Sequence, residues 1–247
     1  MSLFAIADTH LSFASNKPMD DFEGWFNYTD RLKENWNKVI DDKDYVVIAG
    51  DISWAMNFDE LKADFDYINQ LNGKKIILKG NHDYWWNTMS KMNKFIEENN
   101  FNTISILHNN AFDFDDFSVC GSRGWFFDSD EEQNEKVLNR EVMRIKASIE
   151  SALNCEKIVF LHYPPVYENQ CCEEIVSLLK EKGIKGRILT TDYNLFSEPS
   201  ALKELAKFEN IHGVAAKYAF DDNYDGIDFK LISADRLDFM PLLIKKF

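Results

Sequence analysis

Four short runs of apolar residues constrain the fold more than any other feature of the sequence. They are LFAIAD (3–8), YVVIAGD (45–51), KIILKGN (75–81) and KIVFLH (157–162). Each run is apolar at successive positions, which is typical of a strand that is buried on both faces. The sequence therefore predicts a sheet that is covered on both sides.

Helical patterns separate these runs. Amphipathic spacing predicts helices at 30–40, 59–71, 89–98, 131–154, 172–183 and 200–208, and weaker strand candidates lie at 103–107, 117–121, 186–191 and 227–234. Strands that alternate with helices indicate βαβ units and largely parallel pairing. The stretch 101–127 is closer to strand-turn-strand. We therefore expect an α/β sandwich of mixed sheets and not one doubly wound sheet.

The size and charge of the chain limit its organisation and its partners. A chain of 247 residues, 45% of them hydrophobic, can bury one large core, so we expect a single domain over 1–247. The formal net charge of −14 argues against a long nucleic acid as the main partner, because a duplex-binding surface needs a basic stripe. A local basic pocket for a small phosphorylated substrate remains compatible with this charge.

The sequence also predicts a soluble cytoplasmic protein. Its four cysteines show no CxxC spacing, which favours reduced thiols. The first residues, MSLFAIADTH, lack the basic start of a signal peptide. Apolar stretches stay shorter than the roughly 18 residues of a membrane span. The sequence does not indicate an oligomeric state.

Side chains that can bind a metal ion follow each of the four apolar runs. They are Asp8 and His10 in ADTH, Asp51 in GDISW, Asn81, His82 and Asp83 in KGNHD, and His162 in LHYPP. Taken alone, D-x-H and a lone histidine at a strand end are more typical of a turn or of a buried core residue than of a metal site. Together they supply carboxylate, imidazole and amide donors at strand ends, where α/β sheets collect ligands. Such a set suits Mn, Fe, Co, Ni or Zn and lacks the thiolates of a structural zinc site.

Other polar and aromatic residues have weaker interpretations. Arg123 in GSRGWF is either a bidentate donor to a substrate phosphate or an ordinary arginine in a surface turn. The aromatic residues at 84–86, directly after NHD, favour packing over stacking on a substrate. His108 fits none of the blocks and is interpreted as structural.

These blocks resemble the signature of the calcineurin-like metallophosphoesterases. That signature consists of D-x-H, G-D-x-x, G-N-H-[DE], a lone H and G-H-x-H, and the first four blocks stand here as DTH (8–10), GDISW (50–54), GNHD (80–83) and LHYPP (161–165). The likeness is greatest to a subgroup of small bacterial proteins with GDISWAM, KGNHDYWW and SRGWF blocks. It extends from residue 1 to about 183 and resumes at about 208. The resemblance implies a four-layer α/β/β/α sandwich of mixed sheets.

The resemblance also implies a two-metal phosphoesterase site. Asp8 and His10 would hold the first metal, Asp51 would bridge both, and Asn81 and His162 would hold the second. His82 would lie near the leaving group, oriented or charged by Asp83. The implied reaction is hydrolysis of a phosphomonoester or phosphodiester through attack by a metal-bridging hydroxide.

The last block of the signature is altered. The best substitute for G-H-x-H is ENIHG (209–213), in which His212 keeps the first-metal role and Asn210 replaces the second-metal histidine. Residues 187–207 read as an insertion or a rearranged segment. If the strand at 186–191 serves the site instead, Thr191 or Asp192 could approach the metals, or this region could supply no ligand. Since an amide oxygen is a weaker donor than imidazole, we expect the second metal to be bound less tightly.

The main hypothesis is therefore a metal-dependent phosphoesterase that acts on a small phosphoester, with activity that the altered block could reduce. The rival hypothesis is a degenerate member of the family, which would bind a phosphorylated ligand or partner without turnover. A third is a structural protein with vestigial ligands, which would purify without metal.

Overall fold

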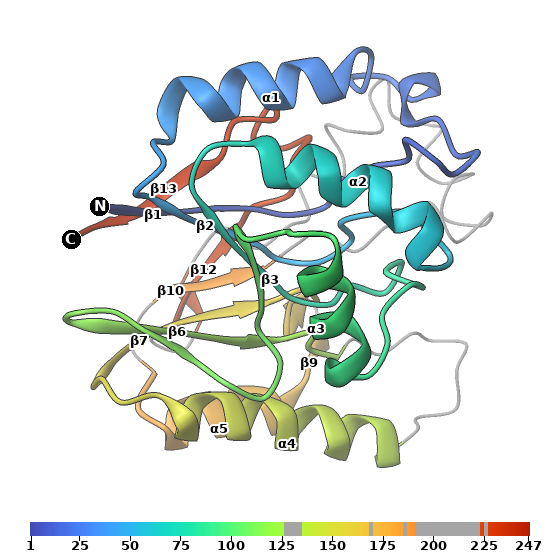
Figure 1. Cartoon of the computed structure of the whole chain (residues 1–247). Coiled ribbons are helices and arrows are strands. Elements are labelled where there is room, and N and C mark those ends of the chain that lie inside the picture. The colour runs from blue at the N-terminus through green and yellow to red at the C-terminus, as the bar shows by residue number, and fades with distance from the viewer. Residues whose placement is uncertain (126–134, 168–169, 185–186, 191–222, 225–226) are drawn as a thin grey trace.

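The computed structural model describes residues 1–125, 135–167, 170–184, 187–190, 223–224 and 227–247. Within them, two sheets pack face to face and helices cover the outer face of each sheet (Figure 1). The four layers confirm the α/β/β/α sandwich. The helix expected at 200–208 lies outside the described residues, and the single-domain organisation stays a prediction.

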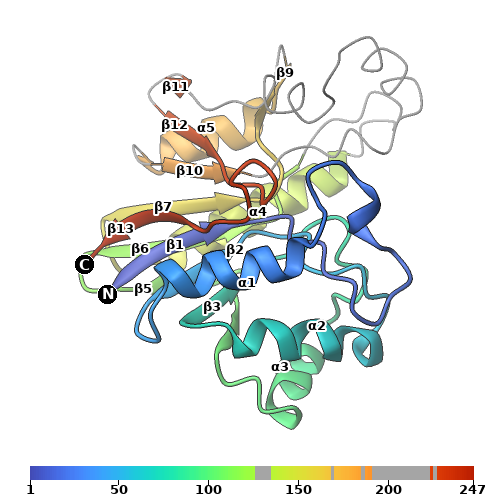
Figure 2. The same cartoon turned by 90° about the horizontal axis from the view of Figure 1, so that it is seen from above.

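The first sheet contains three of the four buried runs. Its order is β13-β1-β2-β3-β4, with β1 at Ser2–Ile6, β2 at Tyr45–Ile48, β3 at Lys74–Ile77, β4 at Ile104–Ile106 and β13 at Leu242–Lys246. Strands β1 to β4 are parallel, whereas β13 is antiparallel to β1. Figure 2 shows β13 beside β1, with the two ends of the chain close together. The carboxyl ends of β1, β2 and β3 therefore share one edge of the sheet.

The second sheet contains the fourth run, in β7. Its order is β11-β12-β10-β7-β6-β5, with β5 at Phe112–Asp113, β6 at Phe117–Ser122, β7 at Glu156–Leu161, β10 at Arg187–Thr190, β11 at Asn223–Tyr224 and β12 at Ile227–Leu231. The four central strands are parallel, and the edge strands β5 and β11 are antiparallel to their neighbours. A separate hairpin pairs β8 (Val166–Tyr167) with β9 (Gln170–Cys171). Both main sheets are therefore mixed, as predicted.

The helices form the two outer layers. On the first sheet lie α1 (Tyr28–Val39), α2 (Phe58–Gln70) and α3 (Met89–Glu98), and on the second lie α4 (Glu135–Ser151) and α5 (Glu173–Glu181); a short 3-10 turn spans Met19–Asp21. Helix α2 begins with a reciprocal cap, because the side chain of Asn57 accepts from the Glu60 N–H while the Glu60 carboxylate accepts from the Met56 N–H. These caps fix where the chain enters the helix after β2.

Alternate residues of the buried strands face two different apolar layers. Phe4, Ile6, Val46 and Ile48 belong to the layer under α1, α2 and α3. Their neighbours Leu3, Ala5, Val47 and Ala49 belong to the layer between the sheets, which the second sheet completes with Phe117, Val119, Ile158 and Phe160. A third layer joins the second sheet to α4 and α5. Burial on both faces explains why the four runs are apolar at nearly every position.

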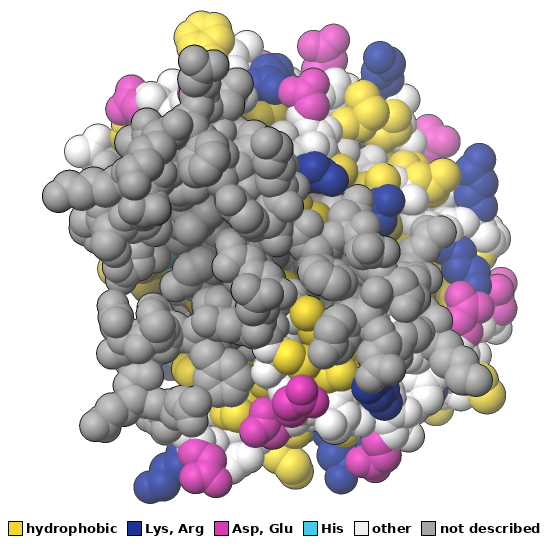
Figure 3. All heavy atoms as spheres, turned by 180° about the vertical axis from the view of Figure 1, so that it is seen from behind, with side chains coloured by type: hydrophobic (Ala, Val, Ile, Leu, Met, Phe, Trp, Pro, Cys, Tyr) yellow, Lys and Arg dark blue, Asp and Glu magenta, His cyan; other side chains and the backbone are white. Residues whose placement is uncertain are grey.

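The surface carries charges of both signs. Figure 3 shows acidic and basic side chains interspersed on the described part of one face. Among the described helices, none combines the length and the apolar character needed to cross a bilayer. Cys120 and Cys172 are buried thiols, whereas Cys155 is exposed.

Candidate metal centre

The candidate metal ligands follow strand ends that meet at one edge of the sandwich. Strand β1 leads to Asp8 and His10, β2 leads to Asp51, and β7 leads directly to His162. Backbone hydrogen bonds connect the first two loops, because the Asp8 N–H donates to the Gly50 carbonyl (3.0 Å) and the His10 N–H donates to the Asp51 carbonyl (3.0 Å). The loops after β1 and β2 are therefore fastened to each other.

Three of these ligand candidates have left-handed backbone conformations. The φ angles are 54° at Asp8, 43° at His10 and 49° at Asp51. A non-glycine residue in this region costs of the order of 1 kcal/mol, and such residues concentrate at functional sites. The turns direct three polar side chains inward at the point where the apolar strands end.

Two glycines allow the loops to approach closely. A Cβ added at Gly80 would lie 2.1 Å from Oδ1 of Asp51, and one added at Gly50 would lie 2.6 Å from Nδ1 of His162. Both distances are shorter than real carbon contacts, so a side chain at either position would displace a ligand candidate. The glycines of the GD and GN blocks are thus required by the space around the centre.

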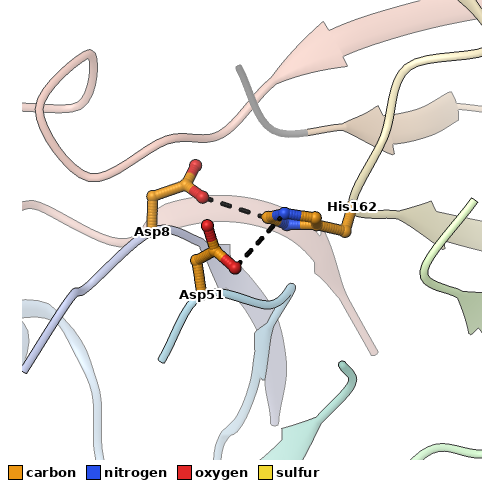
Figure 4. Close-up of side chains that lie close together, drawn as sticks. All are labelled: Asp8, Asp51 and His162. Carbon is orange, nitrogen blue, oxygen red and sulfur yellow. Dashed lines mark ion pairs between the residues drawn. The ribbon is translucent and has the colours of Figure 1, made fainter. Parts of the chain in front are cut away.

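Asp8, Asp51 and His162 form a compact buried group. One ligand atom from each lies within 4.8 Å of the other two. Figure 4 shows both carboxylates directed toward the imidazole, which lies 3.9 Å from Asp8 Oδ1 through Nδ1 and 3.4 Å from Asp51 Oδ1 through Nε2. The other oxygen of Asp51, Oδ2, lies 3.8 Å from Nε2 of His10. Asp51 therefore stands between the two imidazoles, where a bridging carboxylate would have to be.

The protonation state of His162 indicates a cation site. Its Nδ1 lies 3.1 Å from the Ala49 carbonyl, which can only accept, so this nitrogen carries the proton. Burial lowers the pKa of His162 to about 4, so the ring is neutral and Nε2 holds a lone pair. That lone pair faces Asn81 Oδ1 at 2.7 Å as well as Asp51. Acceptors that converge in this way suit a cation between them.

The remaining donors fit a cation equally well. Burial lowers the pKa of His10 to about 3, which leaves it as a neutral potential ligand. Burial also raises the pKa of Asp51 to about 6, and its buried Oδ2 has no hydrogen-bond partner among the described residues. Carboxylate, imidazole and amide donors without thiolate match borderline divalent ions. The residues present therefore fit a divalent metal.

Asp83 makes a set of backbone contacts that the sequence did not predict. Its fully buried carboxylate accepts from four backbone N–H groups and one indole: those of Gly80 (2.7 Å), Ile52 (2.9 Å), Asp51 (3.0 Å), Ser53 (3.3 Å) and Trp85 Nε1 (3.1 Å). The hydrogen-bond partner of the His82 ring is instead Tyr84, whose hydroxyl lies 3.1 Å from Nδ1. Among the described contacts Asp83 thus holds the two ligand loops together, and its predicted influence on the orientation or charge of His82 stays a prediction.

His82 lies beside the ligand group and is partly exposed. Its backbone N–H donates to Asp51 Oδ1 at 2.8 Å, and its ring packs 4.5 Å from that of Trp54. The Trp54 ring also stacks on His10, with centroids 4.9 Å apart and planes at 19°. Burial lowers the pKa of His82, and the nearby Asp51 carboxylate opposes this shift. His82 is thus held by Trp54 and Tyr84 next to the candidate metal ligands.

The aromatic residues after NHD divide into two kinds. Trp85 is buried in the core, as predicted, whereas Tyr84 is 49% exposed and contacts His82. The sequence interpretation missed Tyr84 and Trp54. The only sequence signal for a role of these two residues was their position, because Tyr84 directly follows NHD and Trp54 directly follows GDIS.

Arg123 lies near the ligand group but outside it. Its carbonyl accepts from the N–H of Tyr163 at 2.7 Å, and its charge adds to the effect of burial in lowering the pKa of His162. The buried Nε of Arg123 has no hydrogen-bond partner among the described residues. The position is compatible with an anion-binding role.

The altered last block lies outside the described residues, including His212, Asn210 and the alternatives Thr191 and Asp192. The preceding strand β10 runs parallel to β7, with Thr190 opposite Leu161. Its carboxyl end is therefore at the same edge as His162. The ligand from this region stays a prediction.

Comparison with known protein families gives a match over most of the chain. A family model described as Metallophos, calcineurin-like phosphoesterase, matches residues 1–214. The uncharacterized protein MJ1445 of Methanocaldococcus jannaschii is 35% identical over 86 residues, which cover 33% of this chain and 46% of the relative. The match thus spans about half the length of that relative.

Two solved structures show weaker likeness. The protein of unknown function AQ665 from Aquifex aeolicus is 14% identical with a TM-score of 0.47, over 98% of this chain and 95% of its own. The protein TT1561 of Thermus thermophilus is 14% identical with a TM-score of 0.44, over 76% of this chain and 80% of its own.

Proposed function

Because the chain belongs to the calcineurin-like phosphoesterase family, we propose that it hydrolyses a small phosphomonoester or phosphodiester with the help of two divalent metal ions. The observation that supports this most is the buried Asp8, Asp51 and His162 group, in which the lone pair of His162 faces acceptors. The reduced thiols favour a reducing compartment, so the proposal includes a cytoplasmic setting.

The residues of the centre divide between two metal positions. Asp8 and His10 serve the first, Asn81 and His162 serve the second, and Asp51 lies between the two imidazoles. We assign His212 to the first position from the sequence. Two ions of Mn, Fe, Zn, Co or Ni, when bound, would generate the nucleophile from water and neutralise the phosphate.

We assign His82 and Arg123 to contacts with the substrate. His82 is fixed by Trp54 and Tyr84 beside Asp51, so its imidazole can give a proton or a hydrogen bond to the leaving oxygen. Arg123 presents a buried Nε without a described partner, which suits a substrate phosphate. Charge stabilisation at the phosphoryl group is the expected main source of rate enhancement.

The direct test is hydrolysis of p-nitrophenyl phosphate and of bis(p-nitrophenyl) phosphate with and without added Mn²⁺. We expect metal-dependent release of p-nitrophenol from at least one ester. Metal and phosphate binding without turnover of any ester would favour the rival binding protein. Purified protein that takes up no metal would contradict both.

His82→Ala is expected to lower kcat by about 10²- to 10³-fold, because a positioned proton donor contributes this much. Bound metal should be unchanged, since no donor of the ligand group is removed. The matched control is His108→Ala, which removes a half-buried imidazole whose described ring contact is Trp86. Equal losses in the two variants, or loss of metal in His82→Ala, would contradict the assigned role.

Metal counting tests the asymmetry between the two positions. After dialysis we expect one retained ion per chain, with a second bound only in excess metal, because the sequence interpretation places Asn210 where the family signature has a histidine. Treatment with EDTA should lower the Tm, since a ligand at about 100 times its Kd stabilises by about 2.7 kcal/mol. Two ions per chain that resist dialysis would rule out a weakened second position.

A further inference from the structure

Asp64 is a fully buried carboxylate of helix α2, which covers the first sheet (Figure 1). Its Oδ1 accepts from the Phe13 N–H at 2.9 Å, and its Oδ2 accepts from the Ser53 hydroxyl. Phe13 lies three residues after His10, and Ser53 lies two residues after Asp51. One carboxylate of α2 therefore holds both the loop after β1 and the loop after β2.

The Ser53 hydroxyl fixes the turn that carries Trp54. Its Oγ accepts from the Ala55 N–H at 3.0 Å, which closes a short side-chain turn around Trp54. Because the hydroxyl also donates to Asp64, its position is set from two sides. The Trp54 N–H in turn donates to the Leu11 carbonyl at 2.9 Å. The backbone of Trp54 is thus held in place by both ligand loops.

The segment after Phe13 holds the indole of Trp54. The indole Nε1–H donates to Sδ of Met19 at 3.3 Å, and the ammonium of Lys17 lies 4.2 Å from the ring centroid. A cation over the face of an indole is attracted by the ring. Both contacts come from the segment whose start Asp64 fixes at Phe13. Asp64 therefore holds the turn that carries the indole and the segment that contacts it.

The Trp54 indole is the ring that lies closest to His82. Among the described residues, the His82 ring also contacts Tyr84 and His10, each with centroids 5.9 Å apart, whereas the centroid of Trp54 is 4.5 Å away. His82 is partly exposed, so few contacts keep its imidazole in place. A change in the turn around Trp54 would consequently move the main support of this imidazole.

We propose that Asp64 and Ser53 are positioning residues, which place the imidazole of His82 through Trp54. The inference rests on the proposed function, because that function assigns His82 to the leaving group. The metal ligands should stay in place when either residue is changed, since the carboxylate of Asp83 still holds the backbone of 51–53. The imidazole should shift, and a displacement of about 1 Å costs about 10²-fold in rate.

Nuclear magnetic resonance of the histidine rings tests this placement without turnover. The chain has five histidines, so a long-range ¹H–¹⁵N spectrum of the Zn²⁺-loaded protein contains few signals, and His82→Ala identifies the one from His82. The indole shifts this signal because the two rings are in contact, and Trp54→Leu gives its position without the indole. We expect both Ser53→Ala and Asp64→Asn to move the signal part of the way toward that position.

The matched control is Ser148→Ala on helix α4. Ser148 is also fully buried, and its hydroxyl also makes two hydrogen bonds, because it accepts from the Gly121 N–H at 2.9 Å and donates to the Asn110 carbonyl at 2.6 Å. We expect Ser148→Ala to lower the Tm about as much as Ser53→Ala but to leave the His82 signal unchanged. A signal that moves equally in both variants would reduce Ser53 to a residue of general stability and overturn the proposal.

Kinetics test whether the placement of His82 matters for the leaving group. Phenyl and p-nitrophenyl esters are compared, because phenolate is the poorer leaving group and depends more on a proton donor. Ser53→Ala should lower kcat for the phenyl ester by about tenfold, with little change in KM and a smaller effect on the p-nitrophenyl ester. In a His82→Ala background the same substitution should not lower kcat further, since residues that act through one group are not additive.

The outcomes separate this inference from the proposed function. A His82 signal that stays in place in both Ser53→Ala and Asp64→Asn would overturn the positioning role alone. An equal loss of kcat from Ser53→Ala with and without His82 would do the same, because the effect would then not pass through the imidazole. Metal-loaded wild-type protein that hydrolyses no ester would overturn the proposed function and this role with it.

Discussion

Asp51→Asn is expected to reduce hydrolysis by about 10³-fold or more, because Asp51 is the carboxylate that lies between the two imidazoles. An asparagine keeps an oxygen for the His82 N–H but loses the charge and the second oxygen donor. Metal analysis should show fewer ions per chain than in the wild type. The control Asp59→Asn removes an exposed carboxylate from the first turn of α2 and should leave metal content and rate unchanged.

The same substitution should stabilise the metal-free protein. Burial raises the pKa of Asp51 from 3.8 to about 6, so the fold favours the protonated carboxyl and is destabilised by the ionised one. Below about pH 4 the Asp51 carboxyl is protonated in both the folded and the unfolded protein, so its ionisation does not lower the free energy of unfolding. The cost grows as the pH rises from about 4 to about 6 and is constant above that. The Tm of metal-free Asp51→Asn should therefore exceed that of the metal-free wild type at pH 8, with the difference shrinking toward pH 4.

Calorimetry with and without metal checks both halves of this prediction. With metal, the order of stability should reverse, since the wild type gains more from binding. A metal-free Asp51→Asn that melts below the wild type at pH 8 would show that the carboxylate is stabilised by something other than a cation. A fully active Asp51→Asn would remove Asp51 from the centre.

Asp83→Ala is expected to have the largest effect on folding. It would strip the acceptor from four backbone N–H groups and the Trp85 indole in a buried place. A buried donor left without a partner costs about 1–3 kcal/mol, so a total of at least about 4 kcal/mol is expected even after partial relaxation. For a chain of this size the Tm should fall by about 10 °C.

Comparing Asp83→Ala with His82→Ala distinguishes a residue that holds the two loops together from a residue that takes part in catalysis. Asp83→Ala should lose stability and metal together, whereas the neighbouring His82→Ala should keep both and lose only rate. Thermal unfolding and metal analysis of the two variants, side by side, measure this. A stable, metal-loaded Asp83→Ala with low kcat would instead support the catalytic role that the family resemblance implies for Asp83.

The ends of the buried strands could be predicted because a strand that is buried on both faces is apolar at nearly every position. Every apolar position of β1 and β2 faces one of two apolar layers, so the runs and their polar ends stand out. The direction of each side chain beyond the strand could not be predicted in the same way. At Asp8, His10 and Asp51 it depends on left-handed turns. Asp and His adopt this conformation more often than most residues but still rarely, so residue type alone does not locate the turns.

The hydrogen-bond partners of Asp83 depend on long-range geometry. Asp83 accepts from the backbone of residues some thirty positions earlier in the chain. This relation does not follow from spacing within a block. The family resemblance paired Asp83 with His82, whereas the described hydrogen-bond partner of the His82 ring is Tyr84.

The clamp formed by Asp83 has a consequence for exchanging parts between related proteins. Its carboxylate accepts from the backbone of both 51–53 and Gly80, so the GDIS and GNHD loops are geometrically one part although they are encoded about thirty residues apart. A chimaera that takes only one of the two loops from a relative would combine an Asp83 from one protein with a partner loop backbone from the other. Recombination or loop grafting in this fold should therefore transfer 50–54 and 80–85 as an inseparable pair.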